Sequence, residues 1–185
     1  MSQRSHREPS RKNDHLIIET QLQGAYPPSP ACDCAQCRRC CDRPGWMTVE
    51  DAQAAIRAGY ANRLMLDHCF DIDACESVFI LCPALKGYEK RLAPFVPSSE
   101  AGCTFRTAAG ACEIHGQPSM PLECAFTHHG ENSGKGGQCH RDIVAQWKTD
   151  EAETLIRNWQ RYYRIARRPE AVSAPKPRRN HGKRR

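Results

Sequence analysis

The chain has 185 residues, which is typical of one domain, and its 39 % of hydrophobic residues provide material for one modest core. Twelve cysteines are far more than such a domain usually carries without using the sulfur chemically. Lys and Arg outnumber Asp and Glu by four to two in residues 1–15 and by eight to one in residues 167–185, so the net charge of +6 leaves −3 for residues 16–166. This distribution excludes a basic globular body.

Residues 1–30 are predicted to form a disordered, basic and proline-rich lead-in. The first fourteen residues are polar and charged, and the apolar stretch 16–18 is too short for the core of a signal peptide. No window approaches the length of a membrane span. We therefore expect a cytoplasmic protein with reduced thiols and no membrane partner, rather than a disulfide scaffold.

The predicted domain, residues 31–168, opens with five cysteines between positions 32 and 41. Cys34, Cys37 and Cys40 repeat the Cys-x2-Cys spacing, and Cys41 follows directly. This spacing places thiolates on one tight turn, where they can share a metal ion. Such close thiols pair poorly with one another, because a disulfide demands a specific Cα separation and torsion. The alternative is a group of buried or redox-exposed free thiols.

A helix is predicted over residues 49–58. Thr48 is a good N-cap, Asp51 lies at the capping-box position three residues later, and Gly59 suits the left-handed position that ends a helix. Residues 63–70 are predicted to form a second short helix, with the apolar residues 64–66 in the core.

The next segment is predicted to be mostly extended or irregular. Residues 77–82 read as a buried strand, residues 83–102 as a loop, and residues 103–105 and 112–115 as the two arms of a hairpin. Residues 130–137 are rich in glycine and predict a flexible loop.

Apolar residues fall near helical spacing over residues 141–167, which predicts a long amphipathic helix with a candidate break at residues 149–150. Residues 169–185 are predicted to be a disordered basic tail. The expected fold class is therefore α+β: a small, loop-rich, metal-organised domain with short strands and a long C-terminal helix.

The string CAQCRRCC, residues 34–41, resembles the CxxCxxCC pattern of the YkgJ-type cysteine-cluster family, whose members are described as zinc- or iron-chelating domains. The resemblance covers roughly residues 32–130. The family's later Cys-x-Phe, Cys-x-Ile-Tyr and Arg-Pro-x-x-Cys-Arg steps resemble residues 103–105, 112–115 and 120–125. By this resemblance the ligands of zinc, iron or an iron–sulfur cluster are expected to be Cys34, Cys37, Cys40, Cys41, Cys103, Cys112 and Cys124.

The chain also departs from the family pattern. A histidine replaces the usual tyrosine in the second step, Met120 and Ala125 replace the flanking arginines of the third, and Phe-Thr-His-His follows. These departures add further candidate ligands, each with the simpler interpretation of a surface histidine or a buried cysteine. The candidates are His115, His128, His129 and Cys82, whose following proline is also found in ferredoxin-type sites.

The remaining cysteines outside the pattern are interpreted as bystanders. They are Cys32, Cys69, Cys75 and Cys139, of which Cys139 with His140 forms a weaker metal candidate.

Seven thiolates exceed one tetrahedral zinc site. Two zinc ions, one zinc ion with spare thiols, or an iron–sulfur cluster would all fit this donor set. The leading hypothesis is a metal-binding protein in which the metal ties together a loop-rich chain and organises its fold.

Two alternatives remain open. The resemblance extends to a flagellin lysine methylase, which implies an iron-dependent enzyme related to protein lysine methylation. We favour a non-enzymatic role, because the chain contains no Gly-x-Ser-x-Gly, no His-Glu-x-x-His and no phosphate-binding glycine motif in the right context. The second alternative is a zinc-organised nucleic-acid-binding protein whose basic tail makes weak contacts with phosphates, although such a tail can simply aid solubility.

Overall fold

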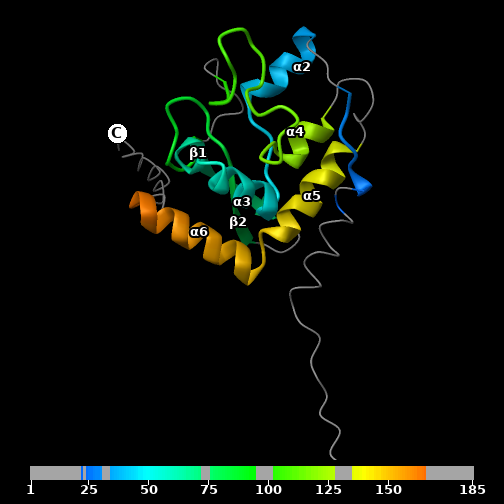
Figure 1. The fold of residues 1–185 in the computed structure, drawn as a ribbon. Helices are drawn as coiled ribbons and strands as arrows, with labels where there is room; N and C mark the ends of the chain where they lie inside the picture. The colour runs from blue at the N-terminus through cyan, green and yellow to red at the C-terminus, as the bar shows by residue number, and fades with distance from the viewer. Residues whose placement is uncertain are drawn as a thin grey trace, which may run out of the picture.

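The computed structural model describes residues 22, 24–30, 34–71, 76–94, 102–127 and 135–165, with only the backbone of Cys40 and Asp71. Figure 1 shows helices around a small two-stranded sheet, so an α+β class is observed. Helix α2 lies at the opposite end of this arrangement from α6 (Figure 1). The elements are α2 Ala35–Arg39, the 3-10 helix η1 Cys40–Asp42, α3 Val49–Arg57, the 3-10 helix η2 Ala61–Arg63, β1 Leu64–Asp71, β2 Glu76–Pro83, α4 Leu122–Phe126, α5 Gly136–Gln146 and α6 Asp150–Tyr163.

Helix α3 confirms the predicted helix and its start. Thr48 Oγ1 accepts a hydrogen bond from the Asp51 N–H at 3.0 Å, and the Asp51 carboxylate accepts one from the Thr48 N–H at 2.9 Å. This reciprocal pair is a capping box, which satisfies two of the N–H groups that a helix start leaves unpaired. Gly59 adopts φ +86°, so the chain leaves the helix where the sequence indicates.

The predicted helix over residues 63–70 is wrong, because this segment is strand β1. It pairs antiparallel with β2 from Leu64↔Pro83 to Asp71↔Glu76. A short apolar run fits a buried strand as well as a helix, and the buried backbone of β2 requires a partner ladder. The predicted strand at 77–82 is confirmed within β2, and residues 64–66 are fully buried, as expected.

The predicted hairpin around residues 103–115 is present as a chain reversal without regular strands. Arg106 and Cys112 form an isolated antiparallel bridge, and the Glu113 N–H donates to the Phe105 carbonyl at 2.9 Å. The segment is anchored to the end of the sheet by a second bridge, between Leu85 and Cys103.

The described part of the predicted long helix consists of two helices. Helix α5 starts at Gly136, inside the predicted flexible loop, and α6 starts where the break was placed, with Thr149 Oγ1 accepting from the Ala152 N–H at 3.3 Å. The indole N–H groups of Trp147 and Trp159 donate to the carbonyls of Met47 and Ala61 at 2.7 and 2.9 Å. The aromatic residues therefore bind these helices to the core.

Tyr26 and Ser29, in the described part of the predicted lead-in, pack on the helices that follow later in the chain. Tyr26 is buried, its hydroxyl donates to the Asp142 carboxylate, and its ring meets Phe126 edge-on at 5.0 Å. Ser29 donates through its N–H to Ala125 and through its hydroxyl to Phe126. In the described ranges no helix is long and apolar enough to cross a membrane.

Asp51 makes the free energy of unfolding depend on pH. Burial raises the pKa of this carboxyl from 3.8 to about 6, against the N–H groups of Thr48 and Leu122, which lower it. The folded state therefore holds this proton over a range in which the unfolded chain has released it. Stability conferred by the protonated form is present below about pH 4 and is lost as the pH rises towards about 6, by about 3 kcal/mol from this group.

We expect Asp51→Asn to become more stable relative to the wild type as the pH rises from about 4 to about 6.5, because the amide keeps an oxygen acceptor and never ionises. Urea unfolding of both proteins across this range measures the difference, in which the titration of other groups cancels. A difference that stays flat with pH would contradict the expectation.

Candidate metal centre

Five of the seven predicted ligands line one pocket of about 1060 Å³. We call it the cysteine pocket and define it by Cys37, Cys41, Cys103, Cys112 and Cys124. These residues come from α2, from η1, from the segment 102–115 and from α4. Residues more than 80 positions apart in the sequence therefore face a common space.

The first cysteine block is helical. Cys37 lies in α2 and Cys41 lies in η1, four residues later, so the two fall on one side of this short helical stretch. Cys34 precedes α2 and does not line the pocket; its sulfur accepts a hydrogen bond from the Cys37 N–H at 3.5 Å.

The segment 102–115, which carries Cys103 and Cys112, is joined to the first cysteine block through the backbone. The Cys103 N–H donates to the Cys41 carbonyl at 2.7 Å. Gly102 adopts φ +68°, and a Cβ there would lie 3.0 Å from the same carbonyl oxygen. Glycine is therefore required at position 102 for the two blocks to approach this closely.

Arg63 supports the segment that carries Cys103 and Cys112. Its guanidinium lies 4.0 Å from the centre of the Phe105 ring and forms two hydrogen bonds of 2.8 Å with the Glu113 carboxylate. Phe105, Cys103 and Ile114 form a small buried group of their own beside the main core. Side-chain contacts thus hold the segment in place, although it contains no regular strand.

The segment 43–46, which has no regular structure, contacts α4 through its backbone. The Gly45 N–H donates to Cys124 Sγ at 3.2 Å, and the Trp46 N–H donates to Glu123 Oε2 at 2.6 Å. A Cβ on Gly45 would lie 2.8 Å from Cys124 Sγ, which real side chains do not tolerate. Two consecutive N–H groups therefore bind two consecutive side chains of α4.

Burial and neighbouring thiols raise the pKa values of the thiols in the pocket. Burial raises the pKa of Cys103 to about 12, and the thiols of Cys41 and Cys112 raise it as well. Burial and then the thiol of Cys103 raise the pKa of Cys124 far above its ordinary value, with a smaller effect from Cys41. A metal that binds such protonated thiols must displace their protons.

Backbone N–H groups act in the opposite direction and lower the pKa values of these thiols. The N–H groups of Phe105 and Gly45, which approach Cys103 and Cys124, lower the pKa of those thiols, and the Ile114 N–H does so for Cys112. Hydrogen bonds from N–H groups favour the charged form of an acceptor, so each of these sulfurs has local support for the thiolate.

The thiols share a pocket but are not gathered around one point. Across the described ranges, no group of three His, Cys, Asp or Glu side chains is placed to hold one ion. The structure does not describe the side chain of Cys40. The predicted ligand set therefore stays a prediction.

The other candidate ligands lie in the pocket, in the core or outside the described residues. His115 is exposed and lines the pocket, whereas Cys82 is fully buried in β2 and does not line it. Cys139 is buried in the core, and Cys69 is half-buried on β1. Cys32, Cys75, His128 and His129 lie outside the described residues.

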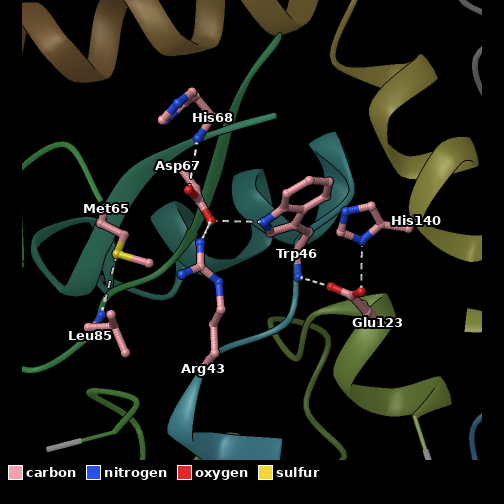
Figure 2. Close-up of polar contacts among 8 residues, drawn as sticks. All are labelled: Arg43, Trp46, Met65, Asp67, His68, Leu85, Glu123 and His140. Carbon is pink, nitrogen blue, oxygen red and sulfur yellow. Dashed lines mark hydrogen bonds and ion pairs between the residues drawn. The ribbon is translucent and has the colours of Figure 1, made fainter. Parts of the chain in front are cut away.

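Sequence reasoning missed a polar network at one wall of the pocket, shown in Figure 2. Buried Asp67 accepts hydrogen bonds from Arg43 at 2.7 Å and from the Trp46 indole N–H at 3.0 Å. On the other side of Trp46, His140 stacks on the indole with ring centres 3.5 Å apart, and His140 Nδ1 lies 2.9 Å from Glu123 Oε1. The signal for Asp67 was a charged residue inside an apolar run.

No family model matches the chain, and neither a curated protein nor a solved structure matches it. The resemblance to the YkgJ-type family and the enzymatic alternative therefore stay predictions. The basic tail lies outside the described residues, so the nucleic-acid alternative also stays a prediction.

Proposed function

We propose that the cysteine pocket binds zinc or iron, the latter as an ion or in an iron–sulfur cluster. The observation that supports this most directly is that cysteines from separate parts of the chain line one pocket. Thiolates are preferred ligands of zinc and of iron–sulfur clusters. Cys34 and Cys40 belong to the same helical block and complete the proposed ligand set.

The donors fit such a metal in their chemistry. Cys103 and Cys124 each receive a backbone N–H, at 3.4 and 3.2 Å, and such hydrogen bonds stabilise a metal-bound thiolate. Among the residues that the structure describes, no three donors lie around one point, so ligation requires rotation of cysteine side chains. The pocket of about 1060 Å³ leaves room for this rotation.

The first metal site in this proposal is formed by four thiols, because a tetrahedral zinc site needs four ligands. Cys103 interacts electrostatically with Cys41 and Cys112, and Cys124 interacts with Cys103 and Cys41. These four come from η1, from the irregular segment 102–115 and from α4. The remaining thiols of the first block are available for a second ion or for a larger cluster.

A metal at this site would act mainly on the fold. The segment 102–115 contains no regular strand or helix, and α4 is a single short helix of five residues. Ligation would cross-link both to the first cysteine block, and the free energy of binding would add to that of folding. Removal of the metal is therefore expected to lower the melting temperature.

The test is metal analysis of full-length protein purified without oxygen, with a visible spectrum and a melting curve before and after chelation. Zinc without colour, or iron with sulfide and broad visible absorption, would support the proposal. A folded protein without either metal, in which all twelve cysteines titrate as free thiols, would overturn it.

A matched pair of variants sharpens this test. Cys103→Ser should weaken metal binding by roughly a hundredfold, because each of four ligands carries about 3 kcal/mol of a binding free energy of order 10–16 kcal/mol. Cys69→Ser is the control, since Cys69 lies on β1 and does not line the pocket. Competition with a coloured chelator measures both affinities, and equal values would count against the proposed ligand set.

A further inference from the structure

We propose that His140 is a nitrogen ligand of the metal in the cysteine pocket and that Glu123 is the carboxylate that orients it. This inference rests on the proposed metal binding. His140 lies on α5 and lines the same pocket as the five cysteines. At a tetrahedral ion, His140 would then occupy one of the four positions in place of one of the four thiols named above, which gives mixed sulfur and nitrogen coordination.

The hydrogen bond to Glu123 determines which ring nitrogen is available. A carboxylate oxygen accepts hydrogen bonds, so the contact of 2.9 Å between Nδ1 and Glu123 Oε1 favours the tautomer that carries its proton on Nδ1. In the neutral imidazole the Nε2 atom then has a free lone pair, which is the form that binds metals. Within the described part of the chain, His140 makes no other side-chain hydrogen bond.

The ring is held in place before any metal arrives. It stacks on Trp46 with an angle of 25° between the planes, and Trp46 is itself held through its indole N–H by buried Asp67. The second oxygen of Glu123 accepts the Trp46 N–H at 2.6 Å. Figure 2 shows His140 and Glu123 facing each other beside the indole. A fixed ring loses little conformational freedom when it binds.

The carboxylate is coupled to a proposed thiolate ligand. Glu123 and Cys124 are consecutive in α4, and the consecutive N–H groups of Gly45 and Trp46 bind their side chains. A histidine that ligates a metal usually donates its other N–H to a carboxylate or a carbonyl. The segment 43–46 thus positions both a thiol and the carboxylate that orients His140.

His115 provides the comparison. It also lines the pocket, but it is exposed, and among the described residues its ring has neither a carboxylate nor a stacking partner. A pocket position alone therefore does not distinguish a ligand, whereas the fixed orientation of His140 does.

The experiment loads full-length metal-free protein with Co²⁺ or Zn²⁺. The Co²⁺ absorption bands and X-ray absorption of the Zn²⁺ form report how many sulfur and nitrogen atoms surround the ion. We expect one nitrogen in the wild type, its loss in His140→Ala, and no change in His115→Ala. His140→Phe is the second variant, because it keeps an aromatic ring against Trp46 and removes the nitrogens.

Glu123→Gln tests the orienting role separately. We expect the nitrogen to remain in the coordination sphere while the metal affinity falls by about 10- to 100-fold, as is usual for a lost outer partner. A purely structural role of Glu123 would lower the stability and leave the metal affinity of the folded protein unchanged.

The outcomes separate the two proposals. A wild type that binds Co²⁺ and Zn²⁺ with an unchanged spectrum in both His140→Ala and His140→Phe overturns the ligand role of His140 and leaves the cysteine centre standing. A folded wild type that binds neither ion, and contains no iron as purified, overturns the proposed centre itself.

Discussion

Replacing Asp67 with alanine should lower the free energy of unfolding by about 3 kcal/mol. The carboxylate is 3 % exposed, and it accepts from the Arg43 guanidinium at 2.7 Å, from the Trp46 indole N–H at 3.0 Å and from the His68 N–H at 2.9 Å. Alanine would leave the buried indole N–H without an acceptor. It would also leave Arg43, which is about one third exposed, to be solvated by water alone.

Two further variants make this result specific. Asp67→Asn keeps one oxygen for Arg43 and Trp46 but turns its amide group towards the His68 N–H, so we expect about half the loss. Asp42→Ala breaks a partly exposed ion pair with Arg106 and should cost less than about 1 kcal/mol. Urea unfolding followed by circular dichroism measures all three. If Asp67→Ala and Asp42→Ala were equally stable, the network would not have the importance that we assign to it.

Local signals in the sequence predicted local structure well. The capping box of Thr48 and Asp51 spans four residues, and its hydrogen bonds form within the helix that it starts. The start of α6 behind Thr149 follows the same logic. Neither feature depends on distant parts of the chain, so sequence alone was sufficient.

Strand β1 was mistaken for a helix because its decisive interactions are not local. Residues 64–66 are apolar in sequence, and this run does not show whether the next residue is buried. Pairing with β2 turns the run into a strand, and Asp67 is buried because Arg43 and Trp46 pack beside it. Asp67, the charged residue that follows residues 64–66, is therefore part of the core.

In the candidate site the sequence indicated the cysteines and, as a weaker metal candidate beside Cys139, His140, but it did not indicate Trp46 or Glu123. Spacing and family resemblance identified Cys37, Cys41, Cys103, Cys112 and Cys124, which line one pocket. The wall formed by Trp46, Glu123 and His140 joins residues 17 and 77 positions apart through common residue types in no recognisable motif. These residues come together only because α5 and the segment 43–46 both pack against α4.

The second large effect is expected for Gly45→Ala, which should weaken metal binding by about 10- to 100-fold and lower the free energy of unfolding by about 1–3 kcal/mol. A Cβ at this position would lie 2.8 Å from Cys124 Sγ, 3.0 Å from the Cys124 backbone nitrogen and 3.1 Å from the Glu123 Cβ. Backbone cannot yield as a flexible side chain does, so either the segment 43–46 or α4 must move.

Either movement lengthens the hydrogen bonds from Gly45 to Cys124 and from Trp46 to Glu123. One methyl group would therefore disturb a proposed thiolate ligand and the carboxylate that orients His140 at the same time. Chelator competition measures the metal affinity, and urea unfolding measures the stability. Gly136→Ala is the control, because its Cβ meets nothing within 4 Å and alanine favours the first turn of α5. Wild-type affinity in a folded Gly45→Ala protein would mean that metal binding does not depend on the position in which the segment 43–46 holds Cys124. The proposed metal site would then have to be formed without α4.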